Sequence, residues 1–85
     1  MKELQATIRY PEALLVGLKT TAERFEKEAA LMLAVKLYEL RRISSGMAAR
    51  IAGLDRVTFL FTLQRYDVPV VDLTEEEFTE EVRNA

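Results

Sequence analysis

Residues 43–66, with the sequence ISSGMAARIAGLDRVTFLFTLQRY, form the stretch that decides the fold. The stretch predicts two short helices that are joined by a tight turn. Ser44 or Ser45 supplies a hydroxyl that can cap the first helix, and Asp55 supplies a carboxylate that can cap the second. Gly53 lies between them, where a tight turn needs a backbone with positive φ. These signals together predict a helix-turn-helix.

The spacing of small and bulky residues strengthens this prediction. Ala49 is small enough for a helix crossing, Gly53 follows four residues later, and the bulky Phe59 follows six residues after that. Such a pattern lets the two helices cross closely and leaves the second one free to enter a DNA major groove. Helical hairpins that bind no DNA share the pattern, so a packing device is the alternative interpretation.

If the unit binds DNA, its arginines and threonines are the candidate contacts. The second helix, residues 55–65, would read base edges, and the arginines around it would hold phosphates. The candidate base contacts are Arg56, Thr58, Thr62 and Arg65, and the candidate phosphate contacts are Arg41, Arg42 and Arg50.

Residues 3–10 alternate between apolar and polar side chains. Leu4, Ala6, Ile8 and Tyr10 fall on one face, which predicts a half-buried strand. A strand followed by two helices also resembles the ribbon-helix-helix layout, in which paired strands of two chains enter the major groove. In that alternative the residues of the other face, Gln5, Thr7 and Arg9, would read the bases.

Two helices are predicted between this strand and the helix-turn-helix. Pro11 suits the first position of a short helix that ends near Leu18, and Thr20 opens a long helix that ends near residues 39–42. The long helix is apolar on two sides, and such a helix is usually buried on two sides. The second side is predicted to meet another subunit, or else to be wrapped by its own chain. The predicted dimer-interface residues are Leu4, Ile8, Leu33 and Leu37.

The C-terminal part is predicted to form a short edge strand and a last helix. Residues 68–73 are rich in β-branched side chains, but Pro69 cannot donate to a ladder. Thr74 begins the last helix. The predicted fold class is therefore mainly α with short β-strands (α+β), divided into residues 1–66 and an acidic segment, 67–85.

Composition and charge limit the possible functions. The chain has 85 residues and contains no Cys and no His, so we expect no catalytic site, metal or cofactor. The longest apolar run, residues 29–35, is too short for a membrane span, and no signal peptide is visible, so we expect a cytoplasmic protein. Residues 1–66 carry eleven Lys and Arg against seven Asp and Glu, whereas residues 67–85 carry one Arg against seven acidic residues. This asymmetry suits two different partners.

Four segments resemble uncharacterised protein family 0175. They are PEALL at residues 11–15, the Ala- and Leu-rich run of residues 30–39, RISSGMAA at residues 42–49, and VPV at residues 68–70. Two positions in the second helix of the motif depart from the expected pattern. Val57 replaces an aromatic residue, and Phe61 stands where a charge is common.

The resemblance implies a small prokaryotic antitoxin of a toxin–antitoxin pair. Such a protein would be a homodimer that binds double-stranded operator DNA and neutralises a PIN-type ribonuclease toxin through its C-terminal segment. The candidate toxin-binding residues are then Phe78, Val82 and Arg83. No membrane or small-molecule substrate is expected. The alternative is a protein–protein adaptor that does not bind DNA.

Overall fold

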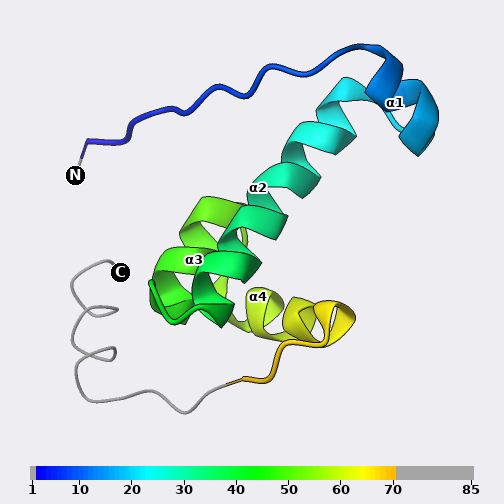
Figure 1. Ribbon diagram of the computed structural model, residues 1–85. Coiled ribbons are helices and arrows are strands. Elements are labelled where there is room, and N and C mark those ends of the chain that lie inside the picture. Colours follow the sequence, from blue (N-terminus) through cyan, green and yellow to red (C-terminus); the bar gives the residue numbers. More distant parts are fainter. Residues whose placement is uncertain (1, 71–85) are drawn as a thin grey trace.

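A computed structural model describes residues 2–70, and every regular element in that range is helical (Figure 1). The predicted α+β class is therefore wrong for the described chain, which is all-α. In chain order the elements are α1 (Ala13–Leu18), α2 (Ala22–Glu39), α3 (Ser45–Ala52), α4 (Arg56–Leu63) and the 3-10 helix η1 (Gln64–Tyr66).

The long helix α2 links two ends of the molecule. The short α1 lies at one end of α2, and α3 and α4 lie at the other (Figure 1). Thr21 caps α2 by accepting a hydrogen bond from the backbone N–H of Arg24 at 3.2 Å, so the cap lies one residue later than predicted. After α2, Arg41 adopts a left-handed conformation with φ 60°, and its N–H donates to the carbonyl of Tyr38 at 2.9 Å. This turn directs the chain back toward α3.

The core lies at the second end of α2. Here α3 packs against α2, and α4 packs against α3. Phe59 is fully buried and meets the ring of Tyr38 edge-on, with 5.9 Å between the ring centroids. Among the described residues, every buried side chain lies between positions 34 and 68. The apolar members are Ala34, Val35, Tyr38, Ala48, Ala49, Phe59, Leu63 and Val68.

The predicted strand at residues 3–10 is absent. The segment is extended, but no backbone hydrogen bond joins it to any other part of residues 2–70. Leu4 is 85% exposed and Ile8 is 64% exposed, so the predicted apolar face is not half-buried. Alternation decides which side chains share a face, but a strand also requires a partner strand, and the described chain offers none.

The edge strand predicted at residues 68–73 is also absent from its described part, residues 68–70. Val68 is only 6% exposed and belongs to the core. Its N–H donates to the carbonyl of Leu63 at 3.1 Å, which closes the turn after α4 instead of starting a ladder. Residues 71–73 and the helix predicted from Thr74 lie outside the described residues.

One side of α2 is buried and the other is open. Ala34, Val35 and Tyr38 lie in the core, as expected for one of the two apolar sides. Met32 and Leu33 are each 51% exposed, and Leu37 is half-buried. The described residues therefore leave the second apolar side of α2 largely uncovered.

Candidate nucleic-acid interface

The turn between α3 and α4 has the geometry that its sequence predicts. Ser44 caps α3, because its hydroxyl accepts a hydrogen bond from the N–H of Met47 at 3.2 Å. Gly53 ends α3 in the left-handed conformation with φ 72°. The next N–H, of Leu54, donates to the carbonyl of Ala49 at 2.9 Å, which completes a helix-ending motif in which glycine is preferred. The prediction of a positive φ at Gly53 is confirmed.

Asp55 fixes the start of α4. Its carboxylate accepts the backbone N–H of Thr58 at 2.7 Å, so the predicted cap is confirmed. The backbone N–H of Thr58 and, less strongly, the Thr58 hydroxyl lower the pKa of Asp55, because both donate to its charged form. The aspartate is therefore ionised at neutral pH, and its charge is favourable at the positive end of the helix.

Helix α4 has a buried side and an outer side. Phe59, Thr62 and Leu63 are buried, at the spacing of one helix face. Thr62 is 8% exposed, and its hydroxyl donates to the carbonyl of Thr58 at 2.8 Å. The structure thus places this candidate base contact on the core side. The sequence already indicated this burial, because Thr62 lies three residues after Phe59 and one before Leu63, which is the spacing of one helix face.

The outer side of α4 carries both polar and apolar groups. Arg56 and Thr58, two of the candidate base contacts, are exposed in the first turn. Val57 is 63% exposed and Phe61 is 66% exposed, and their spacing of four places them next to each other on the helix. This surface is thus an apolar pair flanked by polar residues.

Arg56 also joins the two helices of the unit. Its Nε donates to the hydroxyl of Ser45 at 3.0 Å, and Ser45 lies in the first turn of α3. Sequence reasoning missed this contact, because eleven residues separate the two side chains. The bond holds the Arg56 guanidinium, of which Nε is part, against the first turn of α3.

The other candidate arginines come from three elements. Arg41 and Arg42 are exposed in the turn after α2, and Arg65 is exposed in η1. Arg50 is exposed on α3, and its guanidinium lies 3.7 Å from the carboxylate of Glu3. The α3–α4 unit and its flanking turns therefore present all five arginines, and Arg50 contacts the N-terminal segment.

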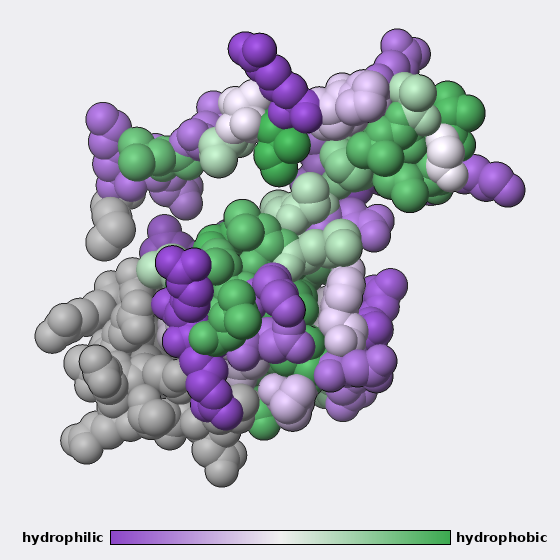
Figure 2. Space-filling model, viewed as in Figure 1, coloured by the Kyte–Doolittle hydropathy of each residue, from purple (hydrophilic) through white to green (hydrophobic). Residues whose placement is uncertain are grey.

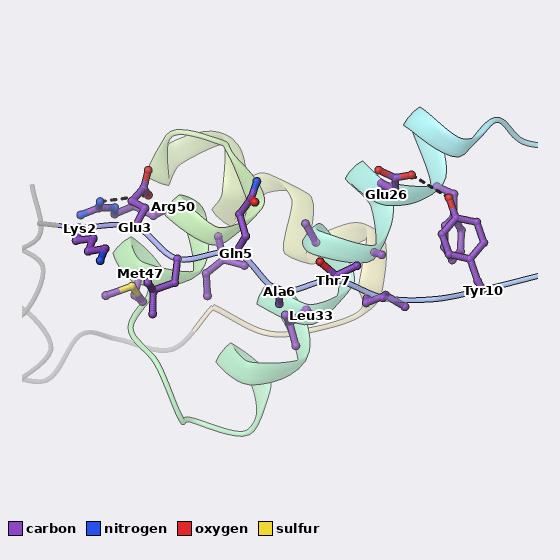
Figure 3. A pocket seen from close by; sticks show the side chains of 16 residues that line it. Lys2, Glu3, Gln5, Ala6, Thr7, Tyr10, Glu26, Leu33, Met47 and Arg50 are labelled. Carbon is purple, nitrogen blue, oxygen red and sulfur yellow. Dashed lines mark hydrogen bonds and ion pairs between the residues drawn. The ribbon is translucent and has the colours of Figure 1, made fainter.

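The extended segment of residues 2–10, hereafter the arm, is attached to the body at both ends (Figure 3). Near one end, Glu3 contacts Arg50. At the other end, the hydroxyl of Tyr10 donates to Glu26 at 2.9 Å, and its ring lies 4.6 Å from that of Phe25 on α2. The hydrogen bond to Glu26 is the main reason that the pKa of Tyr10 is raised.

A groove of about 790 Å³ separates the arm from the body between these attachments. Figure 2 shows it as an open hollow beneath the arm. Leu4, Ala6 and Ile8 line one wall, and the opposite wall includes Leu33 of α2 and Ile51 of α3. The predicted interface residues Leu4, Ile8 and Leu33 are thus brought to one groove, whereas Leu37 is not among its lining residues.

The remaining predictions on sites concern absences or the C-terminal segment. No described helix is long and apolar enough to cross a membrane. Residues 2–70 contain no group of three or more acidic, His or Cys side chains that could hold a metal ion. The candidate toxin-binding residues Phe78, Val82 and Arg83 lie outside the described residues.

The capped α3–Gly53–α4 unit, packed on the end of α2, makes residues 2–70 a small all-α domain with a helix-turn-helix unit. The chain belongs to the uncharacterised protein family UPF0175, whose family model matches residues 1–85. The resemblance that the sequence motifs carried is therefore confirmed.

Relatives from two archaea support this membership. A UPF0175 protein of Archaeoglobus fulgidus is 44% identical over 48 residues, which are 56% of this chain and 55% of the relative. The chain therefore spans about half the length of that relative. A UPF0175 protein of Aeropyrum pernix is 38% identical over 69 residues, or 81% of this chain and 76% of the relative. No solved structure matches the chain.

Proposed function

We propose that this chain is a dimeric DNA-binding regulator, the antitoxin of a prokaryotic toxin–antitoxin pair. It binds its own operator through the α3–α4 unit. It neutralises a PIN-type ribonuclease toxin through the segment of residues 67–85. The observation that carries the DNA-binding part is the capped unit itself, with an exposed outer side of α4 beside basic residues.

The geometry of the unit supports a readout by α4. Gly53 and Asp55 fix the angle at which α4 leaves α3, and the buried side of α4 leaves Arg56 and Thr58 exposed. In helix-turn-helix proteins the N-terminal residues of the second helix reach the base edges. Arg56 and Thr58 occupy those positions here, and Val57 can contact a thymine methyl group.

The electrostatics support a dimer. Phosphate contacts supply most of the non-specific affinity of a DNA-binding protein, and each contact adds to it. Arg41 and Arg42 precede α3, and Arg65 follows α4, so one copy offers only a few such contacts. Two copies on two half-sites double the number, which raises the affinity and makes it more sensitive to salt.

The toxin-binding part of the proposal rests on the family resemblance and on charge. Residues 67–85 carry seven acidic residues and one Arg, in contrast to the basic first part of the chain. A segment of this charge avoids the DNA phosphates and suits a basic rim on a protein partner.

Fluorescence anisotropy with the DNA upstream of the protein's own gene tests the DNA-binding part. Affinity is expected to fall linearly with the logarithm of salt concentration. Arg56→Ala should weaken specific binding by about 1–3 kcal/mol, whereas Arg42→Ala should weaken all DNA equally and reduce the salt slope by about 1. Lys27→Ala is the matched control, because Lys27 is an exposed cation of α2 that pairs with Glu23 at 3.5 Å.

Two outcomes would contradict this proposal. If Lys27→Ala weakens binding as much as Arg56→Ala, the affinity arises from net charge and not from α4. If deletion of residues 74–85 leaves toxin binding at full strength, the C-terminal segment is not the inhibitory part. The same deletion is expected to leave DNA binding unchanged or stronger, because it removes negative charge.

A protein–protein adaptor is the second candidate function. The adjacent Val57 and Phe61 favour it, because an exposed apolar pair on a helix is suited to pack against a partner helix. Absence of any salt-dependent DNA binding, together with toxin binding that Phe61→Asp abolishes, would select this function over the first.

A further inference from the structure

The arm has unused capacity for hydrogen bonding. Residues 3–9 are extended, and no backbone hydrogen bond links them to any other residue in the described range. An extended segment with free N–H and C=O groups can pair with another extended chain. The two attachments, at Glu3 and Tyr10, hold the segment open for such pairing instead of folding it onto the body.

The sequence of the arm is complementary to itself. If two arms lie antiparallel with Ala6 facing Ala6, then Glu3 of each copy faces Arg9 of the other. The same register places Leu4 opposite Ile8, again twice. Opposite charges and apolar pairs that face each other across antiparallel chains are favourable. A two-fold interface has this property, because each contact occurs twice.

Neighbouring registers are less favourable. A shift that faces Gln5 with Gln5 places Glu3 opposite Thr7, and a shift that faces Thr7 with Thr7 leaves Arg9 opposite Gln5. Both shifts lose the pairing of Glu3 with Arg9. Intermediate shifts would place apolar side chains opposite polar ones, because the side-chain period is two.

The groove supplies the surface that such a pair would cover. Leu4, Ala6 and Ile8 of the apolar set line it, together with polar residues of the arm such as Gln5 and Thr7. Leu33 lines the facing wall and is 51% exposed, as is the adjacent Met32. Pairing of two arms would double the apolar area above the groove, and burial of that area is favourable.

We propose that the arm is a dimerisation surface whose occupant is the arm of a second copy. Residues 3–9 of the two copies lie antiparallel about Ala6, and each Glu3 pairs with Arg9 of the other copy. Residues 2–70 of a single chain remain all-α, and the pairing belongs to the two-chain assembly. This inference deepens the proposed function, because it assigns the surface through which the proposed dimer forms.

Disulfide trapping tests the register directly, because the chain contains no Cys. Ala6→Cys is expected to form a covalent dimer under mild oxidation, since facing residues of antiparallel chains have Cα atoms about 4.5–5.5 Å apart. Gln5→Cys and Thr7→Cys should not, because each residue then lies more than about 7 Å from its own counterpart. Val16→Cys, exposed on α1, gives the background for random collision.

Charge reversal tests the predicted ion pairs by analytical ultracentrifugation. Arg9→Glu alone should raise the dimer dissociation constant roughly tenfold, because it replaces two attractions with two repulsions. Glu3→Arg should raise it at least as much, because it also removes the contact of Glu3 with Arg50. The double variant E3R/R9E should recover part of this loss, because it restores the attraction between the arms but still lacks the contact of Glu3 with Arg50. Neither side chain is buried, so the far-UV circular dichroism should not change.

Any of three outcomes would overturn the inference. These are trapping of Ala6→Cys at the Val16→Cys background, trapping of Gln5→Cys or Thr7→Cys in preference to Ala6→Cys, or a double variant as weak as the single ones. All of these measurements are made without DNA. Failure of arm pairing is thus distinguishable from failure of the proposed function, which the salt-dependent anisotropy tests separately.

Discussion

The described chain consists of two regions of similar length that differ in how they bury their apolar side chains. Residues 34–68 contain every buried residue of the described structure, whereas residues 2–33 contain none. The second region is nevertheless rich in large apolar side chains. Exposed examples are Leu4, Ile8, Val16, Leu18, Met32 and Leu33.

The difference separates a region that buries its apolar side chains within one chain from a region that leaves them exposed. In residues 34–68, caps at Ser44 and Asp55 and a left-handed Gly53 set the helices around the core. In residues 2–33, the extended arm lies over an open groove, and the short α1 has no buried residue. Exposed apolar surface of this extent marks an interaction site.

The largest expected effect contrasts two phenylalanines of α4. Phe59 is fully buried, and Phe59→Ala should lower the free energy of unfolding by about 3–5 kcal/mol through the cavity it leaves. Phe61 is 66% exposed, and Phe61→Ala should change the free energy of unfolding by no more than about 0.5 kcal/mol. Urea denaturation followed by circular dichroism measures both. Equal losses would show that Phe61 is covered in solution.

A smaller effect contrasts two glycines, one from each region. An added Cβ meets nothing within 4 Å at either Gly17 or Gly53, so packing does not decide the outcome. Gly53→Ala should cost about 1–2 kcal/mol of global stability, because φ is 72° there. Gly17→Ala should stabilise the helix α1 by about 0.5–1 kcal/mol, but the free energy of global unfolding should not change.

The two glycine variants need different measurements. Urea denaturation should detect the loss from Gly53→Ala, while amide hydrogen exchange should show slower exchange in α1 for Gly17→Ala at unchanged global stability. A rise of about 0.5–1 kcal/mol in the global free energy of unfolding for Gly17→Ala would mean that α1 unfolds together with the core. The division into two regions would then be wrong.

The smallest effect concerns pH and one titrating group in each region. The pKa of Asp55 is lowered, so its stabilisation of α4 is present above the ordinary pKa and is lost as pH falls through the lower folded value. The pKa of Tyr10 is raised, so its bond to Glu26 stabilises the arm at lower pH and is lost as pH rises through the raised value.

NMR titration follows the two groups separately. The Thr58 amide should report the acid transition, and Asp55→Asn, which can still cap the helix, should remove it. The Tyr10 ring should report the alkaline transition, and Glu26→Gln should move it to lower pH. A Thr58 amide that does not respond to acid would contradict the cap in solution.

The sequence predicted residues 34–68 better than residues 2–33 for a physical reason. Ser44, Gly53 and Asp55 act on residues within about three or four positions, so their effects can be read from neighbouring letters. The strand at residues 3–10 failed because pairing depends on a distant partner. The alternation in the arm was real, but no described segment lies beside it to complete a ladder.

The same distinction explains what was missed in the candidate site. The contacts of Arg56 with Ser45 and of Tyr10 with Glu26 join residues eleven and sixteen positions apart. Composition cannot indicate such contacts, because any of several polar residues could satisfy either partner. Thr62 is a different case, since its spacing from Phe59 already indicated the buried side of α4.

The position of the core also sets the order of events in folding. All buried residues of the described range lie within residues 34–68, so no contact between two of them closes a loop longer than this segment. Helical proteins with contacts this local fold on a microsecond to millisecond timescale. During synthesis from the N-terminus, the arm leaves the ribosome well before Val68 completes the core. A nascent chain therefore exposes its arm before it has a stable body, and neighbouring nascent chains on one message can meet through it.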